Sequence, residues 1–277
     1  MAIWGTNFVV IKVGLRDFPP FLFALLRFVL SALPWIFLLA RPHVRWRWLV
    51  LYGVFLGAGQ FGLLYYAMRA DISPGLASLV IQTQVFFTIG LSILLFAERP
   101  RPVALAGIVL AAAGIALIAL NLDATVTAPG IVTVLGAAGC WASANMIVKK
   151  ASREGRAFGM LAFIAWASLF AIPPLTAMWL ALEGWDAGMQ ALRVARVDAW
   201  AALAWQVAGN TLFGFAVWSW LLARYDAAVV SPYALLVPVF GLGSSVLLLG
   251  EGLPGWKLAA AALVLAGIAL NTYFSRR

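Results

Sequence analysis

Long apolar runs separated by short polar or basic segments make up most of the chain. Runs such as 104–120 are apolar on every face of a helix, whereas membrane-spanning strands alternate apolar and polar residues. A helix of roughly 20 residues crosses a hydrocarbon core about 30 Å thick. The pattern therefore predicts an all-α membrane protein with ten transmembrane helices, over 2–15, 20–40, 48–67, 75–97, 103–121, 130–149, 157–182, 200–222, 228–250 and 256–274. The polar segment 183–198 predicts a surface helix or loop.

Composition supports a membrane location. Of 277 residues, 64% are apolar and only 10% are Asp, Glu, Lys or Arg, against about 25% charged residues in soluble domains. So few charges cannot cover the surface of a soluble globule, which excludes a soluble enzyme and a disordered chain. Cys140 is the only cysteine, so the chain cannot form an internal disulfide.

The net charge of +9 comes from basic clusters between apolar runs, such as those in 41–47 and 149–153. This distribution favours a lipid bilayer as the partner and argues against nucleic acid. With the N-terminus inside, twelve of the nineteen Lys and Arg residues fall in cytoplasmic segments and five in outer ones. Lys and Arg favour the cytoplasmic side, so we expect both termini to be cytoplasmic.

An internal repeat divides the chain. A shift of 153 positions aligns 78–117 with 231–270 without a gap, with fifteen identities, and pairs Glu98 with Glu251 at equivalent helix ends. Five spans per repeat is an odd number, so the two halves must cross the membrane in opposite directions. Inverted repeats are typical of secondary transporters, which bind substrate between the repeats.

A second shift, of 137 positions, relates the first span to the sixth. It pairs Trp4 with Trp141, Gly5 with Ala142, Thr6 with Ser143 and Lys12 with Lys149. We therefore predict two inverted five-helix repeats over 1–121 and 122–277, which form one membrane unit. The first span is short by about eight residues against the sixth, or roughly 12 Å, so we expect further native residues upstream.

Six motifs carry a family resemblance: Trp4–Lys12, Pro74–Val80, Phe96–Arg99, Gly139–Asn145, Ser231–Pro238 and Leu249–Glu251. In order and spacing they resemble the EamA branch of the drug/metabolite transporter superfamily. The resemblance implies a ten-helix protein of the bacterial inner (plasma) membrane, with both termini cytoplasmic. It further implies export of amino acids and related metabolites, such as cysteine, O-acetylserine and neutral or aromatic amino acids, by alternating access. A multidrug or nucleotide-sugar transporter of the same superfamily is the alternative.

Polar and aromatic side chains inside spans are the candidates for substrate binding, because polar groups in a membrane are costly and often functional. The candidates are Asn7, Lys12, Tyr65, Tyr66, Gln82, Gln84, Trp141, Asn145, Asn210, Trp218 and Tyr233. Amides offer donors and an acceptor to a zwitterion, and aromatic rings hold an ammonium group by cation–π contact. Hydrogen bonding between helices and simple packing are the alternatives. Pro232 and Pro238 are candidate bending points for gating.

Charged groups inside or beside the spans have two interpretations. Arg27 could pair with a substrate carboxylate. We favour the alternatives, in which it extends to the outer headgroups or makes a structural bond within the protein. Glu98 and Glu251 lie at helix ends and are expected to anchor loops. Because no acidic residue falls in the middle of a span, we expect a facilitator, or exchange coupled at a helix-end Glu.

Other activities find little support in the chain. His43 is the only histidine and lies in a basic loop, and Cys140 has no histidine in its span. The sequence has neither an HExxH motif nor a phosphate-binding glycine loop. We therefore expect no enzyme, cofactor or metal, and a small molecule as substrate. Ten helices suffice for a self-contained pathway, so we expect a monomer.

Overall fold

The structure is a computed structural model that describes residues 1–96, 102–123, 125–154, 158–214, 217, 221, 233–234 and 236–274. Within these ranges the chain is helical and contains no strand, which confirms the all-α prediction. Four helical stretches in the described part are long and apolar enough to cross a membrane: Trp46–Ala70, Pro74–Leu95, Ala128–Glu154 and Met160–Glu183. Shorter apolar helices accompany them. The arrangement as ten spans in two inverted repeats stays a prediction.

The helices of the first half lie where the apolar runs predict them, within a few residues. They are α1 (Ala2–Gly14), α2 (Pro20–Ile36), α3 (Trp46–Tyr52), the π-helix η1 (Gly53–Gly62), α4 (Leu63–Ala70), α5 (Pro74–Val80), the 3-10 turn η2 (Ile81–Thr83), α6 (Gln84–Phe96) and α7 (Pro102–Ala119). Proline at the first position of α2 and of α5 fits a helix start, because its missing N–H has no partner there in any case.

The described helices of the second half include an additional surface helix, α11 (Trp185–Val194). The elements of this half are α8 (Ala128–Glu154), α9 (Met160–Ser168), η3 (Leu169–Ala171), α10 (Ile172–Met178), the π-helix η4 (Trp179–Glu183), α11, α12 (Val197–Trp205), the π-helix η5 (Gln206–Phe213), α15 (Leu236–Leu249) and α16 (Gly255–Phe274). The amphipathic α11 lies within the polar segment 183–198 that predicted a surface helix or loop. Helix α8 extends five residues past its predicted end, and its basic last turn suits the negative end of the helix dipole.

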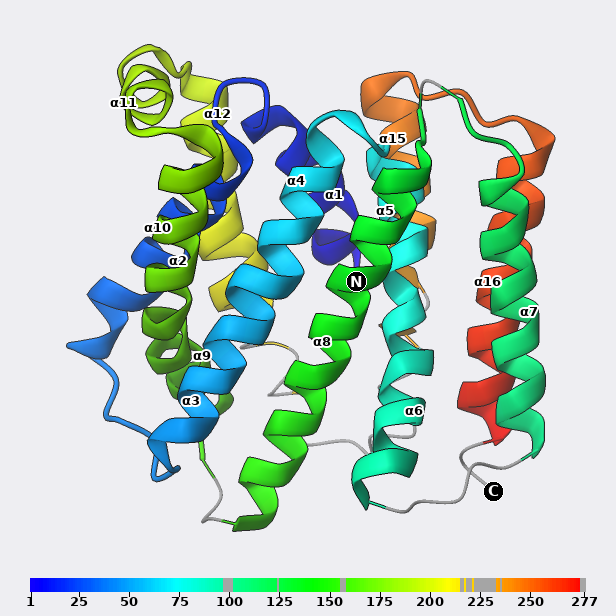
Figure 1. Cartoon of the computed structure of the whole chain (residues 1–277), viewed down its shortest axis with the longest axis horizontal. Coiled ribbons are helices and arrows are strands. Elements are labelled where there is room, and N and C mark those ends of the chain that lie inside the picture. The colour runs from blue at the N-terminus through cyan, green and yellow to red at the C-terminus, as the bar shows by residue number, and fades with distance from the viewer. Residues whose placement is uncertain are drawn as a thin grey trace.

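Packing brings together helices from both halves of the chain. α1 packs on α15, α6 on α8, α2 on α9, and α7 along α16. Figure 1 shows α7 and α16 side by side at one edge of the bundle and α11 above the opposite edge. We call the end of the bundle that carries α11 the α11 end, and the end that carries the start of α3 and the last turn of α8 the basic end.

Charged side chains bind helix termini at the α11 end. Glu183 accepts hydrogen bonds from the backbone N–H groups of Phe21 (2.8 Å) and Leu22 (3.1 Å) in the first turn of α2. Lys12 donates to the carbonyls of Met68 (2.9 Å) and Arg69 (3.0 Å) in the last turn of α4. These contacts satisfy backbone groups that a helix leaves unpaired at its ends.

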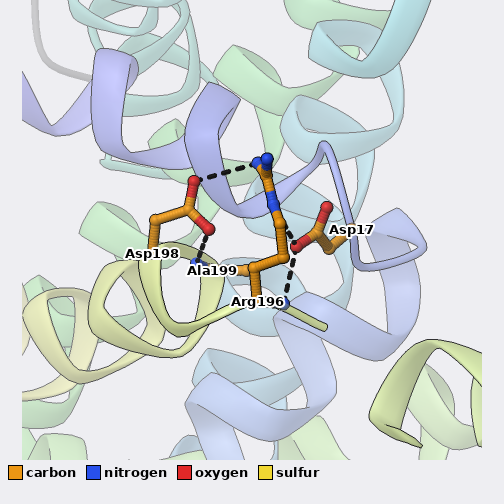
Figure 2. A network of polar contacts seen from close by, with 4 residues as sticks. All are labelled: Asp17, Arg196, Asp198 and Ala199. Atoms are coloured by element: carbon orange, nitrogen blue, oxygen red, sulfur yellow. Dashed lines mark hydrogen bonds and ion pairs between the residues drawn. The ribbon is translucent and has the colours of Figure 1, made fainter. Parts of the chain in front are cut away.

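A second polar cluster joins the loop after α1 to the start of α12. Arg196 donates its backbone N–H to Asp17 at 2.8 Å and its guanidinium to Asp198 at 2.9 Å (Figure 2). The hydrogen bond from the backbone N–H of Arg196 is the main reason why the pKa of Asp17 lies below its usual value. The cluster therefore ties α12 to the α1–α2 loop while Asp17 is ionised.

Candidate functional site

A cavity of about 290 Å³ lies between helices from both halves of the chain. Its walls come from α1, α3, η1, α4, η2, α8, α9, η5 and α15, and they are mostly apolar. The lining residues are Trp4, Asn7, Phe8, Ile11, Tyr52, Leu56, Gln60, Phe61, Leu64, Ile81, Gln82, Trp141, Asn145, Val148, Met160, Asn210 and Val237. An apolar pocket with a few polar groups is the usual form of a small-molecule site.

Five amide side chains supply the polar groups of this cavity: Asn7, Gln60, Gln82, Asn145 and Asn210. The side chains of Gln60 and Asn210 have no hydrogen-bond partner in the described part of the chain, although both are more than nine-tenths buried. Unpaired buried amides are costly, so these two are available to a ligand.

The same two amides occupy matching places. Gln60 lies in η1 after Ala58-Gly59, and Asn210 lies in η5 after Ala208-Gly209. Both segments are π-helical, a conformation that is rare and often found at functional sites. Sequence analysis missed Gln60, although this shared Ala-Gly-amide pattern could have revealed it.

Arg27 lies behind the cavity wall and is 2% exposed. It donates to the Tyr65 hydroxyl (2.8 Å), to Gln206 Oε1 (2.8 Å) and to Thr211 Oγ1 (3.1 Å). Its guanidinium carbon lies 3.8 Å from the centre of the Phe61 ring, which lines the cavity. Arg27 therefore makes structural hydrogen bonds and does not reach the headgroups.

Gln206 connects this buried charge to the cavity. Its Nε2 donates to Asn7 Oδ1 at 2.7 Å, while its Oε1 also accepts from the Tyr65 hydroxyl at 3.0 Å. Sequence analysis did not single out Gln206 or Thr211, because a polar residue in an apolar run does not reveal which buried charge it faces.

Helices α6 and α8 share a row of polar contacts. Asn145 on α8 donates to Gln84 Oε1 (3.0 Å) on α6, and Lys149 donates to Ser92 Oγ (3.1 Å) two turns further along α6. Gln84 thus binds a neighbouring helix, while Gln82 lines the cavity and donates to the Ala234 carbonyl at 3.4 Å. The two glutamines are two positions apart and therefore lie on different faces of the helix.

Of the four described aromatic candidates, one lines the cavity, one is buried beside Arg27 and two are exposed. Tyr65 is fully buried in the Arg27 cluster, and Trp141 lines the cavity. Tyr66 is 49% exposed and stacks on Phe21, away from the cavity. Tyr233 is 58% exposed.

Two prolines and three other residues singled out in the sequence remain to be located. Pro238 is buried inside α15, and Glu251 Oε1 lies 3.4 Å from the backbone nitrogen of Gly75, at the start of α5. Trp218, Pro232 and Glu98 lie outside the described residues.

A second, more polar cavity of about 310 Å³ lies at the α11 end. Lys12, Arg16, Ser73 and Glu251 are among its lining residues. Lys12 was a candidate for substrate binding, and the structure places it in this cavity and on the end of α4 rather than in the cavity lined by amides.

Comparison with known proteins decides the family. The EamA-like transporter family matches residues 1–120 and, separately, 128–273. The chain belongs to the EamA-like transporter family. A "Probable amino-acid metabolite efflux pump" of Salmonella typhimurium is 40% identical over 275 residues, which cover 99% of this chain and 92% of the relative. The protein of the same name from Escherichia coli is 38% identical with the same coverage.

More distant matches also cover nearly the whole chain. An uncharacterised transporter of Bacillus subtilis is 27% identical over 99% of the chain and 95% of its own length. A crystal structure with 20% sequence identity covers 100% of the chain and 94% of its own, with a TM-score of 0.68, which shows the shared fold. The EamA-like chain is therefore a membrane transporter with a small-molecule substrate.

Proposed function

We propose that this EamA-like protein exports amino acids and related metabolites across the inner membrane of a bacterium by alternating access. The observation that carries the proposal is the cavity of about 290 Å³ with five amides in an otherwise apolar wall. Amide groups donate to a carboxylate and accept from an ammonium group, while Trp4 and Trp141 offer rings to an apolar side chain or a cation.

The size of the cavity favours a small metabolite. Drug-sized ligands occupy pockets of roughly 300–1,000 Å³, and this cavity lies at the lower end of that range. A nucleotide sugar carries a diphosphate, and the described residues that line the cavity include no Lys or Arg to bind it. Amino acids therefore fit these walls better than the nucleotide-sugar alternative.

Helix packing supports two inverted repeats. In the sequence alignment the first span corresponds to the sixth and the fourth to the ninth, so the contact between α1 and α15 corresponds to that between α8 and α6. Both pairs pack closely. The separate family matches to 1–120 and 128–273 lie close to the proposed units 1–121 and 122–277.

The position of the cavity supports entry from the cytoplasm. Val148 and Met160 line it near the basic end, where α8 ends and α9 begins. At the α11 end, Glu183, Lys12 and the Asp17–Arg196 pair hold neighbouring helices and loops together. Basic segments favour the cytoplasm, so we assign the basic end to the inside.

No carboxylate lines the amide cavity in the described part of the chain. This supports facilitated export, or exchange coupled at a helix-end Glu, rather than a proton switch in the middle of the membrane. Glu251, in the second cavity, is the described helix-end carboxylate that could serve such exchange.

Counterflow with purified protein in liposomes tests the proposal. Vesicles loaded with an unlabelled amino acid should accumulate the same labelled amino acid, whereas a nucleotide sugar or a cationic dye should not exchange. A screen over cysteine, O-acetylserine and neutral and aromatic amino acids identifies the substrate. Exchange of dyes or nucleotide sugars with no exchange of any amino acid would replace the proposal with the multidrug or nucleotide-sugar alternative.

A further inference from the structure

Arg27 is a buried cation without a carboxylate partner. Its side chain is 2% exposed, and its hydrogen bonds in the described structure go to a phenol, an amide and a hydroxyl, all of them neutral. A buried charge is stable when it is paired, and neutral partners compensate it only in part. The Nε atom of Arg27 has no hydrogen-bond partner among the described residues. The described residues therefore compensate the charge beside the cavity only in part.

The chemistry of Arg27 fixes the orientation of the two amides between it and the cavity. A guanidinium can only donate, so Gln206 must accept through Oε1 (2.8 Å). This leaves Gln206 Nε2 to donate, and Asn7 must accept through Oδ1 (2.7 Å). The assignment therefore follows from the hydrogen bonds themselves and needs no choice between flipped amides.

The Nδ2 group of Asn7 lies at the end of this chain of hydrogen bonds. With Oδ1 bound to Gln206, Asn7 presents its Nδ2 donors, for which the described residues offer no partner. Every bond in the chain is donated in the direction from Arg27 to Asn7, so the positive charge polarises the terminal N–H groups. Polarised donors at a cavity wall are suited to an anionic oxygen.

We propose that Asn7 binds the carboxylate of the transported substrate and that Arg27 acts through Gln206 as the positioning residue that selects carboxylates. This rests on the proposed function and specifies it, since the substrates are molecules with a free carboxylate and an apolar side chain. Decarboxylated amines of the same shape are poor ligands, because their charge has the same sign as Arg27 and they lack the group that Asn7 binds.

The substitution Gln206→Glu tests this selection without removing Arg27. It places a carboxylate beside the guanidinium, at the position of the present 2.8 Å contact, and neutralises the cluster. The matched control is Gln190→Glu on α11, which makes the same change at an exposed position. Thermal stabilisation in detergent is measured with L-leucine, L-phenylalanine and L-cysteine, and with their amines isoamylamine, phenethylamine and cysteamine.

We expect the wild type and Gln190→Glu to bind at least one amino acid about tenfold or more tightly than its amine, which is the size expected for a charge at this range. In Gln206→Glu this preference should largely disappear. Arg27→Met should lose the preference as well, and Arg27→Lys should keep part of it. The readout is the ratio of the affinities for the amino acid and its amine. A general loss of stability weakens the binding of both ligands and does not change this ratio.

If Gln206→Glu does not fold, Asn7→Asp gives the same test, since a carboxylate at residue 7 repels the substrate carboxylate. Equal binding of acid and amine by the wild type, or an unchanged ratio in the folded variants, would overturn the role of Asn7 and Arg27 and leave the proposed function intact. Binding of none of the amino acids by the wild type would instead count against the proposed function.

Discussion

Glu183 shows how a single carboxylate can fix the start of a helix far away in sequence. Helix α2 begins at Pro20, and its next two N–H groups have no partner within the helix. Glu183 accepts from both, at 2.8 and 3.1 Å, and its charge suits the positive end of the helix dipole. The contact thus joins the end of η4 to the start of α2.

Removal of this carboxylate should destabilise the protein. We expect Glu183→Ala to lower the free energy of unfolding by about 1–2 kcal/mol, the usual loss for a helix cap. Thermal unfolding in detergent measures the effect. Asp186→Ala removes an exposed carboxylate three residues away and should change the stability by less than about 0.5 kcal/mol. Equal effects of the two substitutions would show that Glu183 does not act as a cap.

Asp17 predicts a pH dependence at the same end of the bundle. Hydrogen bonds from Arg196 lower the pKa of Asp17 below its usual value, so the folded protein favours the ionised form. The stabilisation is complete above the usual pKa of an Asp and is lost as the pH falls through the lowered value. We therefore expect the unfolding temperature of wild type to fall between pH 6 and pH 3 more steeply than that of Asp17→Asn. Parallel curves would exclude a contribution from this pair.

At the scale of helices, small residues decide how closely the segments approach. A Cβ atom at Gly53, the first residue of η1, would collide with the carbonyl oxygen of Ala167 on α9 and lie 3.0 Å from Phe170 Cβ. At Gly139 on α8 nothing lies within 4 Å of such an atom. Both glycines lie in apolar stretches of the sequence, but Gly53 packs against the backbone of α9 and Gly139 has open space beside it.

This difference predicts opposite outcomes for the same substitution. Gly53→Ala should lower the free energy of unfolding by about 1–3 kcal/mol, because backbone atoms cannot move aside easily. Gly139→Ala should be neutral or slightly stabilising, since alanine favours a helix. Unfolding temperatures of the two variants in detergent give the comparison. If Gly53→Ala left the free energy of unfolding unchanged, η1 and α9 would not be in the close contact that the Ala167 carbonyl makes with position 53.

The apolar pattern was sufficient to predict the helices but not their interior distortions. Hydrophobic length locates each helix, so the predicted and observed bounds of α1, α7 and α16 agree within two residues. The π-helical form of η1 and η5 depends on contacts with other helices, which a local pattern does not contain. The same reason explains why Tyr65 and Tyr66, adjacent in sequence, lie in the Arg27 cluster and on the exposed surface.

For the whole molecule, the position of the cavity indicates the direction in which it opens. Polar contacts hold helices together at both ends, those of Glu183 and Arg196 at the α11 end and those of Glu154 with Arg47 and Trp48 at the basic end. Residues at the start of α9 and late in α8 line the cavity near the basic end. The candidate site could be predicted only in part. Asn7, Gln82, Trp141, Asn145 and Asn210 are recognisable as polar or aromatic residues within spans, whereas Gln60 was missed. The connection from Arg27 through Gln206 needed three dimensions, since these residues are 179 positions apart.

The most direct test is labelling of a single cysteine in the cavity wall. In a Cys140→Ser background, Val148→Cys places a thiol of similar size in the cavity near the basic end. Gln190→Cys on α11 serves as the control for the opposite side. Inside-out and right-side-out vesicles are treated with an impermeant maleimide, with and without the amino acid that the protein exchanges.

We predict that the cysteine at position 148 reacts from the cytoplasmic side and that the transported amino acid slows this reaction. The cysteine at position 190 should react only from the opposite side, at a rate that the amino acid does not change. Reaction at position 148 only from the outer side, or at a rate unaffected by the substrate, would contradict the assignment of this cavity as the transport site.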